Sequence, residues 1–479
     1  MKVKLLVLSL MFIFVSSAAI AADNVTKSAA SEQVSIEVTV YNNNLGLVKD
    51  TRKVALPAGD GELQFMDVAA LIKPETVHVK SLNNADAFTV FEQNYEYDLM
   101  NESKLLDKYV GKKVKIIEWN EYKDKKESLE AELLSNNQGQ IYRINNEIYL
   151  GYPGIKVLPE LPENLIAKPT LMWNYGNKAQ KPHNLEISYL TNGINWKADY
   201  VVVLNKDDSN ADLSGWVTLD NKSGATYKDA RLKLVAGTVH RAEERYDESY
   251  EVKRVYKMAA KAPQFEEKAF FEYHIYDLQR KTTIKDNQAK QISLLEAEGV
   301  KTEKELLVYG NKSYFNRQYR EQNPKQPVNV YIKFKNSKKN NLGMPLPAGI
   351  MRLYKEDDKG SLQFAGEDRI EHTPKDEEVR LKIGEAFDVT AERIQTDYKL
   401  ITSSMTAKVT AHESEWEITI RNHKDTDVIV GIIEPLYGSW SVIKNSHPYK
   451  KVDAFTLRFD VKVPKDKEVK VRYRVRVEL

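Results

Sequence analysis

The chain has 479 residues, with 71 basic and 69 acidic side chains, eight histidines and no cysteine. The lack of cysteine excludes disulfide bridges, thiolate chemistry and attachment of a lipid to a cysteine. Its length predicts about three domains, each large enough to bury a core of its own.

The first 21 residues have the pattern of a secretory signal peptide. Lys2 and Lys4 precede an apolar stretch over residues 5–15, and Ala19-Ile20-Ala21 fits a signal-peptidase site. The alternative is a retained N-terminal anchor, but the apolar stretch is shorter than the ~20 residues of a membrane-spanning helix. We therefore predict an exported protein, periplasmic or secreted, with residues 22–33 as a disordered start.

Cleavage after residue 21 would remove Lys2 and Lys4 and leave 69 basic against 69 acidic side chains. Such a balance gives no overall field that would attract nucleic acid or an anionic membrane. No second apolar stretch reaches the ~18 residues that a membrane helix needs. We therefore expect no nucleic-acid partner and no transmembrane segment after signal cleavage.

Residues 34–103 predict a small N-terminal β domain, because residues 34–41 alternate between apolar and polar side chains and turn clusters follow. Residues 104–170 contain short, closely spaced β patterns, which predict a small barrel of the SH3 or OB kind. The strands expected in that barrel cover residues 113–119, 129–134, 140–144 and 147–150.

Residues 184–479 predict a large β-sandwich region of immunoglobulin-like type, so the whole chain is expected to be mostly β and multi-domain. The clearest alternation is in residues 469–479, where valines on one face alternate with basic side chains on the other. Residues 455–463 alternate in the same phase, and residues 465–468 between them therefore predict a hairpin turn.

Two stretches of this region lack the alternation. Residues 242–269 are dense in charges of both signs and predict a flexible excursion between strands. Residues 290–309 mix leucine and valine with glutamate and lysine, which fits either a short helix or a strand.

Three motifs occur in a fixed order: residues 189–200 (YLTNGINWKADY), 214–221 (SGWVTLDN) and 230–237 (ARLKLVAG). In this order and spacing they resemble exported bacterial proteins of the domain-of-unknown-function family four-one-three-nine, with mucoidy inhibitor A proteins as distant relatives. The resemblance implies a β-rich fold and export, but it supplies no activity, cofactor or catalytic residue. On their own terms, Trp196 and Tyr200 fall on the apolar side of a strand and are expected in a core.

The motifs for metal and nucleophile chemistry are incomplete. His412-Glu413 begins like the zinc motif H-E-x-x-H, but Trp416 replaces the second histidine in a segment that is typical of a strand. Residues 205–212 offer oxygen ligands, but Asn210 and Trp216 stand where a calcium loop needs glycine and glutamate, so a hairpin turn is favoured. We predict no catalytic residue, no cofactor and no metal site.

Two charge patterns leave alternatives open. Pairs of carboxylates for glycoside cleavage need only a suitable separation in space, which a sequence does not show. The basic face of residues 470–476 fits either an anionic polymer or, in our preferred interpretation, a solvated sheet surface that resists aggregation.

The segments 434–440 and 446–449 join expected strands and are rich in aromatic side chains. Such loops on β-sandwiches often form recognition surfaces, and equally often fold over the end of the sandwich. The candidate recognition residues are Tyr437, Trp440, His447 and Tyr449.

The leading hypothesis is a non-enzymatic cell-envelope protein with binding or scaffolding β modules, and with a protein or glycan partner. One alternative is a metal-independent hydrolase that acts on envelope glycan or peptide. Another is regulation of surface polysaccharide, which rests on family analogy alone.

Overall fold

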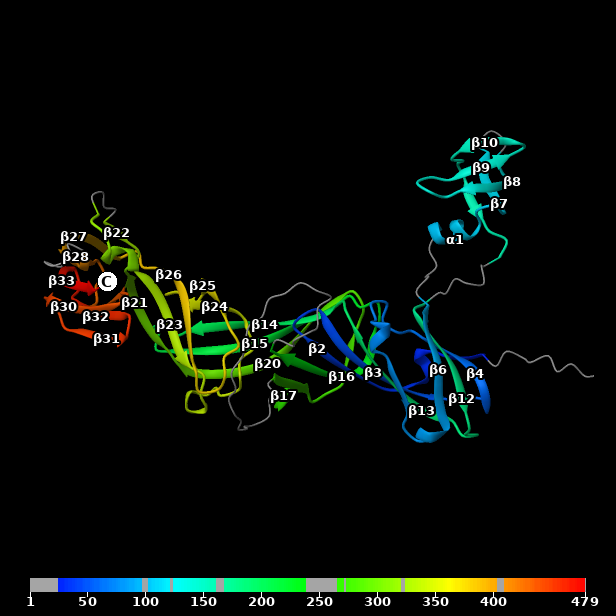
Figure 1. Cartoon of the computed structure of the whole chain (residues 1–479), viewed down its shortest axis with the longest axis horizontal. Coiled ribbons are helices and arrows are strands. Elements are labelled where there is room, and N and C mark those ends of the chain that lie inside the picture. Colours follow the sequence, from blue (N-terminus) through cyan, green and yellow to red (C-terminus); the bar gives the residue numbers. More distant parts are fainter. Residues whose placement is uncertain are drawn as a thin grey trace, which may run out of the picture. The chain divides into compact units, whose positions relative to one another are not determined.

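The computed structural model describes residues 25–478 apart from residues 97–101, 121–123, 161–167, 238–264, 271–272, 320–323 and 403–408. The described residues are mostly β-strands, as expected (Figure 1). The expected signal peptide and most of the expected charged excursion lie outside them. Among the described residues, no helix has the length and apolarity needed to cross a membrane.

The chain divides into two compact units that do not follow the linear order of the expected domains. Unit 1 comprises residues 1–36, 47–191 and 223–225, and unit 2 comprises residues 37–46, 192–222 and 226–479. The chain therefore passes from one unit to the other several times, which a search for boundaries along the sequence does not reveal.

Unit 1 holds a four-stranded sheet in the order β1-β4-β12-β6. Its strands are β1 (Val25–Ser28), β4 (Gly59–Met66), β6 (Phe88–Glu96) and β12 (Thr170–Asn177). Part of the expected disordered start is thus a strand, because the backbone of β1 pairs in parallel with β4. β12 lies between β4 and β6, so a strand distant in sequence completes the N-terminal β region.

A second group of strands in unit 1 pairs β13 with both β3 and β5. These strands are β3 (Leu45–Val54), β5 (His78–Ser81) and β13 (His183–Thr191). The side chain of Arg52 is fully buried. Its Nε and Nη2 donate to Asp50, its Nη1 donates to the Ser28 carbonyl, and Phe65 lies under its guanidinium. A buried cation is tolerated here because it is both paired and stacked.

Residues 102–157 fold around a separate small core. The helix α1 (Glu102–Lys108) covers a five-stranded sheet in the order β10-β9-β8-β7-β11. Its strands are β7 (Lys113–Asn120), β8 (Lys125–Ser135), β9 (Ile141–Ile144), β10 (Glu147–Leu150) and β11 (Ile155–Val157). The four expected strands are confirmed, but the sheet ends at β10 and β11 as edges and does not close into a barrel.

The first half of unit 2 is a sandwich. One sheet has the order β20-β15-β14-β24-β25, and the facing sheet contains β17, β18, β16 and β2. Trp196 of β14 donates a hydrogen bond to the carbonyl of Val235 on β16 and packs edge-on against Tyr276 of β18. The expected core roles of Trp196 and Tyr200 are confirmed, since both are buried.

The strands of this sandwich come from many parts of the chain. They are β2 (Gln33–Tyr41), β14 (Ile194–Leu204), β15 (Asn210–Asn221), β16 (Tyr227–Ala236), β17 (Phe265–Phe270), β18 (Tyr273–Leu278), β19 (Thr282–Ile284), β20 (Gln288–Lys301), β24 (Gly349–Glu356) and β25 (Leu362–Ile370). β17 uses the last residues of the expected excursion, because they pair with β18. β14 pairs in parallel with β24, and β16 with β2, so the sheets are not purely antiparallel.

The second half of unit 2 is the C-terminal sandwich, drawn in yellow-green to red in Figure 1. One sheet has the order β26-β23-β21-β29-β32-β31, and the other the order β22-β27-β28-β33-β30. The first comprises β21 (Glu303–Tyr309), β23 (Asn329–Lys335), β26 (Glu378–Glu385), β29 (Val428–Pro435), β31 (Tyr449–Asp453) and β32 (Thr456–Val463). The second comprises β22 (Lys325–Gln326), β27 (Val389–Thr402), β28 (Val409–Asn422), β30 (Ser439–Asn445) and β33 (Lys467–Glu478).

The expected hairpin between the last two strands is wrong. β32 pairs with β29 and β31, whereas β33 pairs with β28 and β30 in the other sheet. Residues 464–466 therefore carry the chain from one layer to the other. Both strands alternate in the same phase because their inward side chains, such as Phe459 and Tyr473, meet in one core. A hairpin and an arch between layers give the same alternation.

Residues 290–309 are strand apart from Thr302, which separates β20 from β21. β20 belongs to the first sandwich and β21 to the second, so the chain bends between them at Thr302. The leucines in this stretch are buried in the two cores.

Candidate functional site

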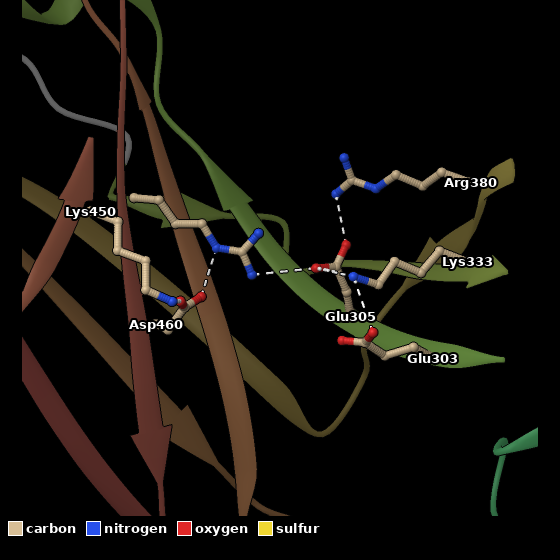
Figure 2. Close-up of polar contacts among 7 residues, drawn as sticks. Glu303, Glu305, Lys333, Arg380, Lys450 and Asp460 are labelled. Carbon is tan, nitrogen blue, oxygen red and sulfur yellow. Dashed lines mark hydrogen bonds and ion pairs between the residues drawn. The ribbon is translucent and has the colours of Figure 1, made fainter. Parts of the chain in front are cut away.

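The outer face of the sheet that contains β21 carries a cluster of seven charged side chains, which we call the charged cluster (Figure 2). Five strands contribute to it, and the residues are far apart in sequence. They are Glu303 and Glu305 of β21, Lys333 of β23, Arg380 of β26, Lys450 of β31, and Arg458 and Asp460 of β32.

Glu305 is the centre of the charged cluster. Its carboxylate lies 3.4 Å from Lys333 Nζ, 3.2 Å from Arg380 Nη2 and 3.3 Å from Arg458 Nη2. Only 10% of its side chain is exposed. Three cations from three strands thus hold one carboxylate in a fixed position, as Figure 2 shows.

Gly431 of β29 allows Arg458 to reach Glu305. β29 lies between β21 and β32, and Arg458 must cross over it. A Cβ at Gly431 would lie 2.6 Å from Leu307 Cδ2 and 3.3 Å from Arg458 Nη2. A glycine inside a buried strand often marks such a close approach, and this signal was available in the sequence.

The remaining ion pairs extend the charged cluster on both sides. Asp460 lies 2.6 Å from Arg458 Nε and 3.0 Å from Lys450 Nζ. Burial raises the pKa of Asp460, but hydrogen bonds from Arg458 and Lys450 outweigh it, so the pKa is lowered. Burial lowers the pKa of Lys333, but Glu303 and Glu305 outweigh it, so the pKa is raised. Both groups are therefore held in their charged forms at neutral pH.

Two tyrosines flank the charged cluster. The guanidinium of Arg380 lies 4.3 Å from the ring centroid of Tyr331, and Tyr309 packs edge-on against Tyr331. Tyr309 is one of the exposed large side chains of the protein. Flat rings beside fixed charges provide contact area for a ligand at a small cost in side-chain entropy.

A cavity of about 440 Å³ opens beside the charged cluster, at the bend between β20 and β21. It is lined by lysines from three segments, together with Asn340 and two glutamates. Lys333 and Glu303 belong both to the cavity wall and to the charged cluster. The other lysines of the wall are Lys301, Lys335 and Lys339.

Buried asparagines fix the wall of this cavity. Asn340, with 9% of its surface exposed, accepts a hydrogen bond from the Lys301 amide and donates to the carbonyls of Lys301 and Lys335. Asn336, which is fully buried, donates to the Met344 carbonyl and accepts from the Gly343 amide. The loop that carries Lys339 is thereby held against the ends of β20 and β23.

The opposite face of the C-terminal sandwich is also charged, but its charges are matched strand by strand. The basic residues of β33 face the acidic residues of β28: Lys470 and Arg472 pair with Glu417, and Arg476 pairs with Glu413. Arg474 pairs with Asp397 and Glu415. The basic face expected from residues 470–476 therefore exists, but acids from a neighbouring strand neutralise it, which favours the solvated-surface interpretation.

One ion pair is buried inside the C-terminal core. Arg393 Nη1 is 2.7 Å from Glu434 Oε1 and 3.2 Å from the hydroxyl of Tyr473, and both charged side chains are almost fully buried. The ring centroid of Trp416 lies 5.7 Å from the guanidinium. Burial raises the pKa of Glu434, and Arg393 opposes that shift. Because only 2% of the Arg393 side chain and none of the Glu434 side chain is exposed, we assign this pair to the core and not to a ligand site.

The four candidate recognition residues lie around β30 and β31. Tyr437 precedes β30 and Trp440 lies within it, and both pack against the core. Trp440 Nε1 donates a hydrogen bond to the Ala454 carbonyl, and Lys451 lies over its ring. His447 Nδ1 is 2.8 Å from Ser446 Oγ, and Tyr449 packs against Phe459. The recognition role of these residues stays a prediction.

The residues that partly match metal-binding motifs have structural roles. His412 lies on β28, as expected, and its Nδ1 is 2.6 Å from the hydroxyl of Tyr398. Asn205 Oδ1 accepts hydrogen bonds from the amides of Ser209 and Asn210, which closes the β14–β15 turn on itself. Within the described parts of the chain, no three His, Asp or Glu side chains gather as a metal site would require.

One arrangement in unit 1 has the composition of a hydrolase triad. Ser81 Oγ lies 2.9 Å from His183 Nδ1, and His183 Nε2 lies 3.0 Å from Asn177 Oδ1. All three residues are buried, and the Asn177 amide donates to three backbone carbonyls. Burial lowers the pKa of His183. The arrangement ties a loop to the sheet and offers no substrate access at the serine.

A family model described as a domain of unknown function, DUF4139, matches residues 185–479. The chain belongs to this family. The DUF4139 region contains every strand named above for the two sandwiches of unit 2 except β2. It also includes the whole charged cluster and the cavity. A search of curated proteins finds no match to the chain.

Proposed function

We propose that this DUF4139 protein is an exported, non-enzymatic binding protein of the cell envelope, and that it binds through the outer face of the β21 sheet. The observation that carries the proposal is the charged cluster itself. Seven charged side chains are held in place by one another beside an open cavity. A face organised before binding loses little entropy when a ligand binds.

The contacts of Glu305 favour binding over acid–base catalysis. A general base needs a carboxylate oxygen within reach of the proton that it removes. Both oxygens of Glu305 already face cations: Oε1 faces Lys333 and Arg458, and Oε2 faces Arg380. Among the described residues, no arrangement specifically favours the hydrolase alternative.

The test compares capture of envelope components by the mature protein and two charge-reversal variants. Arg380→Glu/Lys382→Glu alters the proposed face, and Lys444→Glu/Lys467→Glu makes the same charge change on strands of the other sheet. We expect the first variant to lose a partner that the second retains. Equal capture by both folded variants would refute binding through this face.

Two further measurements test the parts of the proposal that rest on the sequence. N-terminal sequencing of the protein from the envelope fraction should begin near Ala22, and an intact Met1 would indicate an anchor. Trp440→Ala tests the recognition loop, since a variant that retains every specific partner would remove the loop from the binding surface.

A further inference from the structure

We propose that the cavity at the β20–β21 bend binds an anionic group, a carboxylate or a phosphate, carried by a larger ligand. The inference rests on the proposed function and names its ligand class. Three of its lysines, Lys301, Lys335 and Lys339, have no ion-pair partner among the residues that the structure describes. Unpaired ammonium groups around one cavity are the complement of an oxyanion.

The charges of the cavity wall do not cancel. Lys333 is occupied by Glu303 and Glu305, at 3.2 and 3.4 Å. Glu378 is then the one remaining acid of the wall, against the three unpaired lysines. The cavity is therefore positive although the chain as a whole has a formal net charge of only +2. A concave wall with an excess of one sign of charge concentrates the field and raises the local concentration of counter-ions.

Two buried asparagine side chains hold the loop that carries Lys339. Asn336 and Asn340 are buried, and burying a polar side chain is unfavourable unless it forms hydrogen bonds. Here their amides hold both ends of the loop and the backbone of Lys301 and Lys335. The lysine backbones are consequently fixed before a ligand arrives, and only the side chains need to adjust.

The size of the cavity sets the kind of ligand. A volume of about 440 Å³ falls within the range of small-molecule sites and exceeds that of a lone phosphate or carboxylate. We therefore infer that the anionic group enters as part of a larger unit. Tyr331 of β23 lies two residues from Lys333, which lines the cavity, and Tyr309 packs against Tyr331.

The test is a calorimetric titration of the full mature chain with inorganic pyrophosphate and, separately, with citrate. Lys335→Ala/Lys339→Ala removes two unpaired lysines of the cavity. Lys444→Ala/Lys467→Ala removes the same charge from the other sheet and serves as the control. We expect the cavity variant to bind about tenfold more weakly, and the control to change by less than about twofold.

The outcomes separate the sources of the anion. Binding of pyrophosphate alone indicates a phosphate ligand, and binding of citrate alone indicates a carboxylate ligand. The proposal is overturned if neither probe binds or if both variants weaken binding equally. If the cavity variant captures every envelope partner while Arg380→Glu/Lys382→Glu loses one, the proposed function stands and this site fails. If anions bind but no partner depends on the face, the site stands and the proposed function fails.

Discussion

The two outer faces of the C-terminal sandwich are both charged, but their charges are paired differently. On the β28–β33 face, each basic side chain of residues 470–476 meets an acid on the adjacent strand. On the β21 face, three cations share Glu305, while Lys301, Lys335 and Lys339 around a cavity have no ion-pair partner in the described part of the chain. The first arrangement cancels its own field, whereas the second leaves a positive site.

The difference shows that a basic run in a sequence is a poor guide to a basic site in a sheet. Alternating residues of one strand face their neighbours on the next strand, so pairing across strands decides which charges remain. The proposed site draws its lysines from three separate segments, none of which is a basic run on one strand face.

The largest effect concerns the ion pair in the core between the two faces. Arg393→Ala would leave the Glu434 carboxylate buried without its cation. We expect a loss of about 3–5 kcal/mol in the free energy of unfolding, measured by urea denaturation. The double variant Arg393→Met/Glu434→Leu should recover much of it, because it removes both charges. A single variant as stable as the wild type would show that the pair carries no energetic weight.

The next effect distinguishes the two kinds of surface pairing. Glu305→Gln removes the charge that three cations share, and we expect it to cost about 2 kcal/mol. Glu468→Gln breaks one half-exposed pair with Arg421 on the other face and should cost less than about 0.5 kcal/mol. Urea denaturation of both variants measures the difference, and equal losses would contradict the central role of Glu305.

Gly431→Ala should be destabilising by about 1 kcal/mol, because its methyl group would press on Leu307 and Arg458. Gly384→Ala is the matched control: it lies on β26 of the same sheet, and a Cβ there would meet no atom within 4 Å. We expect the control to be neutral or slightly stabilising in thermal melts. A neutral Gly431→Ala would mean that Arg458 does not need to cross β29 closely.

Lowering the pH should reduce the stability that the ion pairs contribute on both faces, since both contain carboxylates of lowered pKa. Hydrogen bonds from Arg472 and Lys470 lower the pKa of Glu417. The unfolded chain therefore binds more protons below the ordinary glutamate pKa of about 4.3. The contribution of Glu417 to stability is present above that pH and is lost as the pH falls. Wild type should lose more stability than Glu417→Gln between pH 6 and pH 3, and parallel loss would contradict the pairing.

A smaller pH effect is expected in unit 1. Burial lowers the pKa of His183, so the unfolded chain takes up a proton below the ordinary histidine pKa of about 6.5 while the folded chain does not. Stability should therefore fall as the pH drops below that value. His183→Gln should remove this part of the pH dependence in urea denaturation between pH 7.5 and pH 5.5.

Much of the fold could be predicted from alternation alone. The strands over residues 34–41, 194–204 and 467–478 follow period two closely, since one face of each is buried. Pairing could not be predicted, because β32 and β33 show the same phase whether they form a hairpin or face each other across a core. The pairing of β1 with β4 could not be predicted either, since an edge strand pairs through its backbone and needs no pattern of side chains.

The candidate site was missed for a related reason. Glu303 and Glu305 lie in a stretch that fitted a helix or a strand equally well, and their cations come from strands more than 25 residues away. Only the glycine inside the apolar run 428–433 gave a local signal of close approach. Of the aromatic residues chosen from the sequence, Tyr437 and Trp440 pack against the sandwich core, and none belongs to the charged cluster.

The most direct test follows individual lysines while an anion is added. In the reductively ¹³C-methylated protein, each lysine gives an NMR signal that can be assigned by substitution. Titration with pyrophosphate should shift the signals of Lys335 and Lys339 to saturation and leave that of Lys470 unchanged. Parallel, unsaturated shifts of all three signals, or an earlier shift of Lys470, would contradict the assignment of the positive site to the cavity.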